Sequence, residues 1–230
     1  MNGVYEIMCY GDSNTWGTVA KHHISEPHRR YGRDVRWPCV LETLLGPGFA
    51  VEEEGLGGRT TIYTANPDLP FKNGMHMLEG CVKTHYPLDL VIMMLGTNDL
   101  HQPKPLPEDR LCTGIITLIE LVQSHPEYGP EEKRVPDILL ISPPFITRSA
   151  PDARTEVYAQ FFGEYGERLS HRFPEEYRKA AEKYHCWFLN SQEYTHPDAR
   201  DGVHLDAESH LRLAAAVCEK VLEIRKEQFK

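Results

Sequence analysis

The sequence predicts an α/β fold: one domain over residues 1–230, built as a three-layer, doubly wound parallel sheet of about five strands with helices on both faces. Short apolar runs alternate along the chain with segments whose apolar residues recur at helical spacing. One run, over residues 88–95, is apolar almost throughout, as expected of a strand buried on both faces. Most runs end in turn-forming residues such as Gly, Asp, Asn, Ser and Pro.

The first strand is predicted over residues 4–10, where an extended apolar run ends in the turn GDSNTWG over 11–17. Apolar residues at i, i+3, i+4, i+7 and i+8 then predict a helix over 37–45. The pair Gly46-Pro47 ends that helix, because glycine suits a helix terminus and proline cannot continue one.

The second strand is predicted over 49–54, and its three consecutive glutamates favour a place at an edge of the sheet. It leads directly into a glycine-rich turn, GLGGRTT, over 55–61. A helix is then expected to end near His85. The central strand over 88–95 follows, and it stops at the polar turn GTND over 96–99.

The second half of the chain continues the alternation. Strands are predicted over 137–141 and 186–189. Helices are predicted over 111–122, 152–172 and 211–222. Phe173-Pro174 breaks the second of these helices, and a shorter helix then continues to Tyr184. With right-handed crossovers and the common order 2-1-3-4-5, the switch point of the sheet lies between strands one and three. Ligands bind at such a point, outside the carboxyl ends of the strands.

Composition restricts the classes of partner. The net charge of −9 and the lack of a Lys/Arg run argue against nucleic acid or an anionic membrane. We find no signal-peptide pattern and no apolar segment of membrane-spanning length. Six cysteines without a CxxC pair favour reduced core thiols and a cytoplasmic location. The histidines of the segment 21–33 lack a standard ligand spacing, so we expect a solvated loop, with neither metal nor cofactor.

Three turns are expected to meet at the switch point, because Ser13 follows strand one, Gly57-Gly58 follow strand two, and Asn98 follows strand three. A serine on a strand tip suits a phosphate clamp, a helix cap or a nucleophile. The backbone N–H groups of Ser13 and Gly58 and the side-chain amide of Asn98 are suitable donors for a developing oxyanion. In the simpler alternative, Asn98 closes an Asx turn and the glycines only satisfy backbone geometry.

A base for the serine is available in the segment DGVHLD, just before the last predicted helix. His204 titrates near neutral pH, and Asp201, three residues earlier, is close enough to hold its tautomer. In the alternative, Asp201 caps a turn and His204 packs against the start of the helix. Asp206 is the better candidate for the helix N-cap, which leaves Asp201 available to His204.

These segments together resemble the SGNH (GDS-type) hydrolase family: GDSNTWG, a glycine turn, GTND and DGVHLD follow one another across most of the chain. The longer strings EEGLGGRTT, LDLVIMMLGTND and ISPP are similar to its arylesterase/acyltransferase branch. The resemblance implies Ser13 as nucleophile, His204 as base, Asp201 as the residue that orients His204, and Asn98 as an oxyanion donor. It also implies short-chain esters as substrates, acyl transfer to other acceptors in some members, and assembly into homo-oligomers.

The glycine-rich turn over 55–61 departs from the pattern of the SGNH family, because many members carry a polar residue where Gly57 stands. We match the oxyanion position to Gly58, the residue before Arg59, and keep Gly57 as the alternative. Trp16 is expected either to form a wall of the acyl pocket or to pack beneath the turn. Phe145, Ile146 and the segment up to Phe162 are expected to form more of the substrate-binding rim.

The sequence therefore predicts a serine esterase that acts on a small ester through an acyl-enzyme. An alternative enzyme is a carbohydrate or lipid deacylase with the same catalytic residues. An alternative of another class is a non-catalytic binding module with a flavodoxin-like outline, which the acidic net charge and the lack of a phosphate-binding loop disfavour. No G-x-S-x-G motif is present, which disfavours the common α/β-hydrolase architecture.

Overall fold

The computed structural model describes residues 3–64, 66–101, 104–130, 134–148 and 156–228. Its five-stranded parallel sheet has the order β2-β1-β3-β4-β5, as the sequence predicts. The strands are β1 (Tyr5–Gly11), β2 (Phe49–Gly55), β3 (Leu90–Met94), β4 (Asp137–Ser142) and β5 (Trp187–Asn190). The glutamate-rich β2 is an edge strand, as expected.

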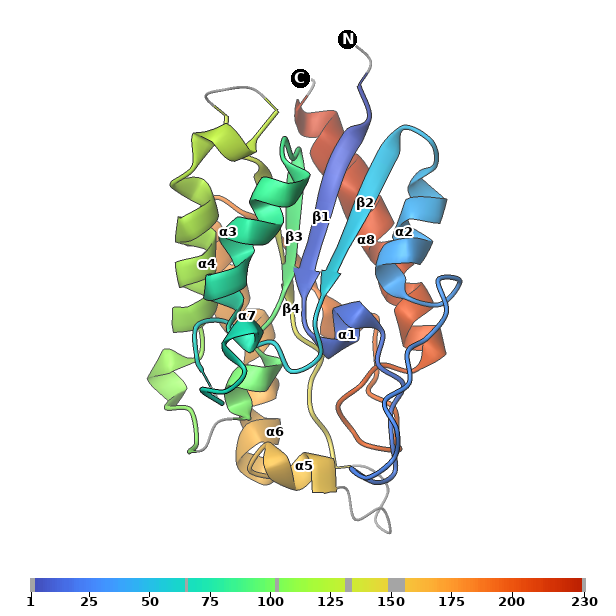
Figure 1. Cartoon of the computed structure of the whole chain (residues 1–230), viewed down its shortest axis with the longest axis vertical. Coiled ribbons are helices and arrows are strands. Elements are labelled where there is room, and N and C mark those ends of the chain that lie inside the picture. Colours follow the sequence, from blue (N-terminus) through green and yellow to red (C-terminus); the bar gives the residue numbers. More distant parts are fainter. Residues whose placement is uncertain (1–2, 65, 102–103, 131–133, 149–155, 229–230) are drawn as a thin grey trace.

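Helices cover both faces of the sheet and give the three predicted layers (Figure 1). They are α1 (Ser13–Trp16), α2 (Trp37–Leu45), α3 (Gly74–His85), α4 (Thr113–Gln123), α5 (Glu156–Gln160), α6 (Glu164–Ser170), α7 (Phe173–Lys183) and α8 (Ala207–Gln228). Helices α2 and α8 pack on one face, and α3, α4 and α7 pack on the other.

The side chains of β1 show why two separate cores form. Ile7 and Cys9 point to the α2/α8 face and Met8 and Tyr10 to the opposite face, as the two-residue period of a strand requires. All five residues of β3 are buried, so its uninterrupted apolar run reflects burial on both faces.

The predicted long helix over 152–172 is wrong in its continuity. Within the described residues it is two short helices, α5 and α6. Phe162 between them has a φ of 62°, a left-handed conformation that an α-helix does not contain. The apolar spacing persists across the break, so the sequence pattern alone gives no sign of it. Residues 152–155 lie outside the described residues.

The other predicted helix boundaries agree with the structure, except that the last helix, predicted over 211–222, is longer, since α8 spans Ala207–Gln228. Helix α2 covers the predicted residues, and Pro174 lies in the first turn of α7. Asp206 caps α8, since its Oδ1 accepts a hydrogen bond from the Ser209 backbone N–H at 2.7 Å. Asp201 is thus not needed for that cap.

The six cysteines are free thiols, three of them buried. Among the described helices, none combines the length and the apolar composition that crossing a bilayer requires. Within the same residues no cluster of His, Cys, Asp and Glu side chains has the arrangement of a metal site.

His210 on α8 is a buried imidazole without a hydrogen bond. It is fully shielded from solvent, and neither ring nitrogen has a partner among the described residues. Its ring meets Tyr31 edge-on at 5.3 Å. Burial lowers the pKa of His210 to about 4, opposed by Asp206 and assisted by His204 and Arg36.

This burial predicts a pH-dependent stability difference between the protein and its His210→Leu variant. The unfolded chain binds a proton at this imidazole below about pH 6.5, whereas the native state excludes it until about pH 4. Native stability is therefore lost as pH falls through that window. The free energy of unfolding of His210→Leu, taken relative to that of the wild type, should therefore be about 2 kcal/mol larger at pH 5 than at pH 7. Urea unfolding of both proteins at the two pH values measures this, and a pH-independent difference would contradict it.

Candidate active site

Ser13 lies where β1 ends and the short helix α1 begins, at the carboxyl edge of the sheet. Gly11 permits this tight turn, since a Cβ at that position would lie 1.9 Å from the Thr15 hydroxyl oxygen. Asp12 caps α1 by accepting the Asn14 backbone N–H at 2.9 Å. The turn thus places Ser13 just beyond the carboxyl end of β1.

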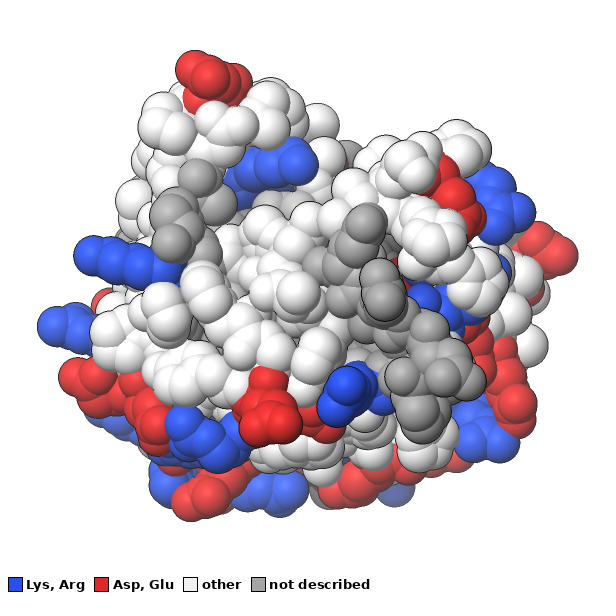
Figure 2. All heavy atoms as spheres, turned by 90° about the horizontal axis from the view of Figure 1, so that it is seen from below, with Lys and Arg blue, Asp and Glu red and all other residues white. Residues whose placement is uncertain are grey.

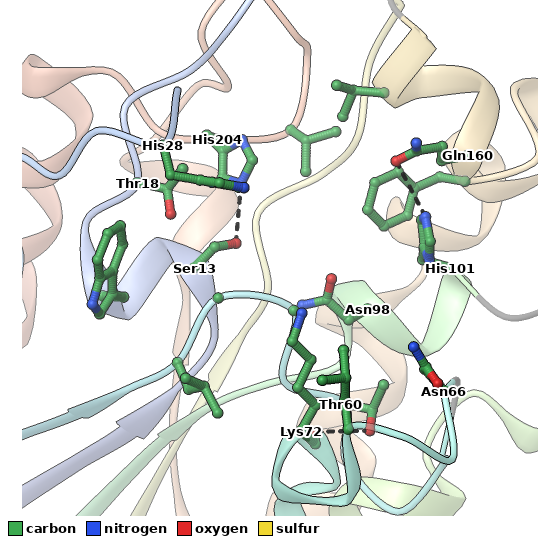
Figure 3. Close-up of a pocket in the computed structure, with 18 of the residues that line it drawn as sticks. Ser13, Thr18, His28, Thr60, Asn66, Lys72, Asn98, His101, Gln160 and His204 are labelled. Atoms are coloured by element: carbon green, nitrogen blue, oxygen red, sulfur yellow. Dashed lines mark hydrogen bonds between the residues drawn. The ribbon is translucent and has the colours of Figure 1, made fainter. Parts of the chain in front are cut away.

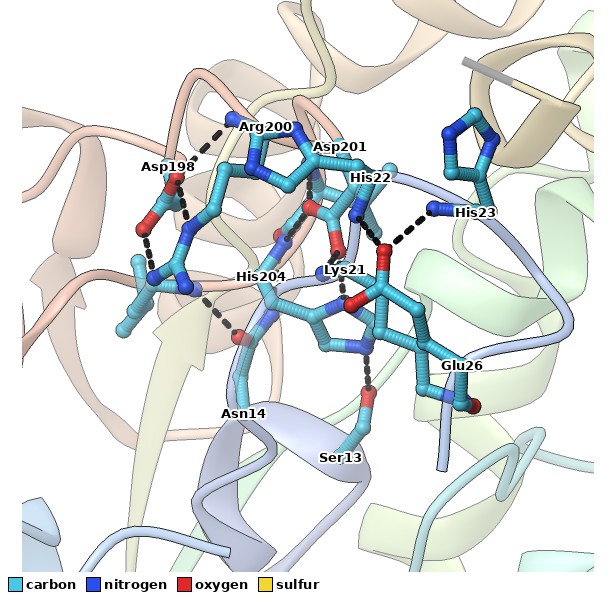
Figure 4. Close-up of polar contacts among 12 residues, drawn as sticks. Ser13, Asn14, Lys21, His22, His23, Glu26, Asp198, Arg200, Asp201 and His204 are labelled. Atoms are coloured by element: carbon cyan, nitrogen blue, oxygen red, sulfur yellow. Dashed lines mark hydrogen bonds and ion pairs between the residues drawn. The ribbon is translucent and has the colours of Figure 1, made fainter. Parts of the chain in front are cut away.

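A chain of hydrogen bonds joins Ser13 to His204 and Asp201 (Figure 4). The Ser13 Oγ lies 3.1 Å from His204 Nε2, and His204 Nδ1 lies 2.7 Å from Asp201 Oδ2. A carboxylate only accepts hydrogen bonds, so the proton is on Nδ1 and the lone pair of Nε2 faces the serine. This is the arrangement in which an imidazole can remove a serine proton.

The Asp201 carboxylate is fully buried yet remains ionised at neutral pH. Burial by itself would raise its pKa, but the hydrogen bond and charge of His204 and the backbone N–H groups of His204 and Val203 hold the pKa below its usual value. Both N–H groups donate to Oδ1 at 3.0 Å. The Lys21 backbone N–H donates to Oδ2 at 3.2 Å and further fixes the carboxylate.

Asn14 connects the serine turn to the histidine loop, a function that the sequence analysis missed. Its Nδ2 donates to the Val203 carbonyl at 3.3 Å, and its Oδ1 accepts the Leu205 N–H at 2.9 Å. The side chain is buried. These two bonds fix the residues on either side of His204 relative to Ser13. An asparagine next to the serine is visible in the sequence, but its partners lie almost 200 residues away.

Replacing Asn14 by alanine should therefore weaken both stability and activity. The change leaves the buried Leu205 N–H and Val203 carbonyl unpaired, which costs about 3 kcal/mol. A small displacement of His204 should lower kcat/KM by about 10- to 100-fold. Thermal unfolding and hydrolysis of 4-nitrophenyl acetate well below the melting temperature separate the two effects. If the fractional loss of activity is no larger than the fraction of Asn14→Ala molecules that are unfolded, Asn14 does not position His204 for the reaction.

The turn after β2 brings Gly58 to the same site. The Arg59 N–H closes this turn on the Leu56 carbonyl at 3.0 Å, and Gly58 has a φ of 77°, a conformation that favours glycine. The backbone N–H groups of Ser13, Gly57 and Gly58 donate no hydrogen bond within the described residues. Each is therefore available to a ligand.

The Asn98 side chain lies beside these groups (Figure 3). Its Nδ2 donates to the Arg59 carbonyl at 3.1 Å. The second N–H of the amide has only a long contact, 3.5 Å, to Asp12 Oδ2. Asn98 is thus held in place by one strong hydrogen bond, and its second N–H could reach a substrate oxygen by giving up the long contact to Asp12.

Arg59 holds the turn after β2 against β1, a role that its place in the sequence does not indicate. Its guanidinium is buried, donates to the carbonyls of Gly11 (2.9 Å) and Glu54, and lies 4.2 Å from the Tyr10 ring centroid. The glycine-arginine pair was visible in the sequence, but nothing local indicated a guanidinium directed into the protein.

Two carboxyl groups beneath the site are buried strongly enough to resist ionisation. Burial raises the pKa of Asp12 to about 6 and that of Asp99 to about 7. Asp99 accepts the backbone N–H and the hydroxyl of Thr61, at 2.8 and 2.6 Å. At neutral pH Asp12 is therefore still mostly ionised, whereas Asp99 is only partly ionised.

The site opens into a cavity of about 840 Å³ (Figure 3), a size typical of small-molecule sites. Ser13, Gly57, Gly58, Asn98, Asp201 and His204 all line it. Apolar lining is provided by Trp16, Ile24, Leu56, Tyr63, Leu69, Val157, Phe161 and Val203. The cavity also has polar walls, so it suits a small substrate with both apolar and polar parts.

The predicted substrate-binding residues have different outcomes. Trp16 lines the cavity, with the Arg30 guanidinium 5.0 Å from its ring. Phe145 and Ile146 do not line it. Phe145 stacks on His171 at 4.9 Å, and Ile146 is fully buried in the core. These two residues therefore do not fit the predicted rim, whereas the later part of the same predicted segment does line the cavity through Val157, Gln160 and Phe161.

Comparisons with known proteins found a matching family model and several similar structures. The model of the GDSL-like lipase/acylhydrolase family matches residues 9–212. The fold is similar to that of an aryl esterase from M. smegmatis, with 33% identity, a TM-score of 0.83, and coverage of 96% of this chain and 99% of that one. It is equally similar to a carbohydrate acetylesterase from Sinorhizobium meliloti, with 30% identity, a TM-score of 0.83 and the same coverage. A comparison with curated proteins found no match.

Proposed function

Because the chain belongs to the GDSL-like lipase/acylhydrolase family, whose members include the SGNH esterases, we propose that it hydrolyses short-chain carboxylic esters with Ser13 as its nucleophile. The observation that carries this proposal is the hydrogen-bonded series Ser13–His204–Asp201 at the mouth of the cavity. A serine hydroxyl attacks an ester only when a base removes its proton, and His204 Nε2 has the position and the free lone pair for that.

The first half of the reaction forms an acyl-enzyme. Ser13 Oγ attacks the ester carbonyl carbon while its proton moves to His204 Nε2. The imidazolium that forms is stabilised by the ionised Asp201 carboxylate on Nδ1. His204 then gives the same proton to the leaving alcohol as the carbon–oxygen bond breaks.

The carbonyl oxygen becomes negatively charged during attack and needs hydrogen-bond donors. We assign this role to the backbone N–H groups of Ser13 and Gly58 and to the second N–H of the Asn98 amide. Gly57 is the alternative to Gly58, since its N–H is also unpaired within the described residues. Donors fixed in advance lower the barrier because they need no reorganisation when the charge develops.

The second half releases the acid. A water molecule, deprotonated by His204, attacks the acyl carbon, and Ser13 leaves with the proton. An alcohol in place of water would give acyl transfer, which the resemblance to the acyltransferase branch supports as a secondary activity. A carbohydrate deacylase is the second candidate function, since one similar structure is a carbohydrate acetylesterase and the cavity has polar walls.

One experiment tests the proposal and a second ranks the substrates. A fluorophosphonate should add once to the protein and map to Ser13 by peptide mass spectrometry, and labelling at another residue would contradict the assignment. The kcat/KM values for 4-nitrophenyl acetate, butyrate, octanoate and for acetylated monosaccharides should then separate a short-chain aryl esterase from a carbohydrate deacylase. We expect acetate or butyrate to be the best of the aryl esters.

A further inference from the structure

The cavity carries a charge opposite to that of the whole protein. The chain has a net charge of −9, yet among the described residues the charged ones that line the cavity are Lys21, Lys72 and Asp201. Asp201 is the only carboxylate among the described lining residues, and it is paired with His204. Figure 2, which views the molecule from below, shows a hollow with mainly uncharged walls and a basic side chain on one of them. A cavity of this kind attracts anions.

Lys72 is the first of the two lysines that make the cavity positively charged. It ends a short 3-10 helix, Pro70–Lys72, and its side chain extends into the cavity towards Asn98 (Figure 3). Its Nζ lies 2.9 Å from the point where a Cβ on Gly58 would be. Its ammonium makes no ion pair or hydrogen bond within the described part of the chain. Three N–H donors are therefore free beside the proposed oxyanion site.

Lys21 adds a second cation, which forms no ion pair with the residues that the structure describes. Its side chain is only 8% exposed, and its Nζ donates to the Glu26 backbone carbonyl at 2.7 Å. The Glu26 carboxylate instead accepts the backbone N–H groups of His22 and His23, both at 3.0 Å (Figure 4). The field reaches His28, another lining residue, whose pKa is lowered by burial and then by the charges of Lys21, His204 and Lys72.

We propose that the preferred substrate is an ester that carries a carboxylate a few bonds from the scissile carbonyl, and that Lys72 binds this carboxylate. The inference rests on the proposed esterase function and names its substrate class. A neutral ester forms no ion pair with the Lys72 ammonium. An ester that carries a carboxylate accepts a charge-assisted hydrogen bond from it in a partly enclosed site. Asp201, the one carboxylate among the described lining residues, is paired with His204, and Lys72 has no ion pair within the described residues, so the ligand carboxylate would be the partner of Lys72.

The test uses pairs of esters that differ only in charge. The first pair has the charge in the acyl half: 4-nitrophenyl hydrogen adipate and 4-nitrophenyl methyl adipate. The second pair has it in the alcohol half: 4-acetoxybenzoate and methyl 4-acetoxybenzoate. For each pair the anionic-to-neutral ratio of kcat/KM is measured in the wild type, in Lys72→Met and in Lys179→Met. Lys179 is an exposed lysine on α7, paired with Glu175 and not part of the cavity lining.

Lys72→Met should lower the ratio about tenfold for one of the pairs, and that pair identifies the half that carries the carboxylate. Lys179→Met should leave both ratios as in the wild type. Intrinsic reactivity differences within a pair cancel, because the same pair is compared between proteins. In the wild type the affected ratio should also fall as NaCl rises from 50 to 500 mM, and this part of the test needs no variant.

Two results would overturn the inference while leaving the esterase proposal intact. One is a ratio that neither Lys72→Met nor salt changes. The other is an equal loss for both members of each pair, which would place the Lys72 charge on the oxyanion of every ester instead. Failure of the wild type to hydrolyse any of the four esters, together with no fluorophosphonate labelling, would overturn the proposed function and this inference with it.

Discussion

Replacing Ser13 by alanine is expected to lower kcat/KM for 4-nitrophenyl acetate by about 10⁴- to 10⁶-fold and to abolish fluorophosphonate labelling. Without the Oγ no covalent intermediate forms, and His204 has no proton to remove. The donors assigned to the oxyanion would remain, so a small residual rate above that of water is expected. The side chain is small and lies at a helix N-terminus, so the fold should persist.

Ser124→Ala is the matched control for this change. Ser124 is an exposed serine at the end of α4, where its hydroxyl donates only to the Leu121 carbonyl. The control should keep its activity and its labelling. Turnover by Ser13→Ala within tenfold of the wild type would contradict the assignment of the nucleophile.

Replacing Asp201 by asparagine is expected to reduce kcat by about 10⁴-fold with little change in geometry. The Oδ2 oxygen accepts hydrogen bonds from His204 Nδ1 and from the Lys21 N–H. An amide nitrogen at that place donates instead of accepting, so His204 shifts its proton to Nε2. The imidazole then presents an N–H to Ser13, and the serine loses its base.

Asp206→Asn provides the comparison for Asp201→Asn. Asp206 is only two residues from His204, and asparagine caps a helix as well as aspartate does. This variant should retain wild-type kcat within a few-fold. Proton NMR of the histidine ring in Asp201→Asn should show the changed tautomer, and a wild-type tautomer together with a large rate loss would argue for another cause.

Sequence patterns were sufficient for the fold because they depend on local chemistry. The alternation of apolar runs and helical spacing led to the observed strand order, and the glutamates of β2 correctly indicated an edge strand. The pattern failed at Phe162, where apolar spacing continues through a left-handed residue that breaks the helix. Spacing records which face a side chain occupies, but it does not record a single change of φ.

For the candidate site, the sequence by itself determined which segments meet there. The short motifs around Ser13, Gly58, Asn98 and His204 lie at the ends of predicted strands or before a helix, and parallel strands bring such ends together. The contact between Asp201 and His204 also follows from sequence, since it spans a single turn.

Only the tertiary structure decided what surrounds those motifs. It placed Asn14 and Arg59 as clamps between distant segments, turned Phe145 and Ile146 away from the cavity, and directed the Lys72 ammonium beside Gly58. The reason is physical: a motif at a strand end is positioned by backbone hydrogen bonds that every sheet shares. A cavity wall is positioned by loops whose packing partners lie far away in sequence, and no local pattern specifies them.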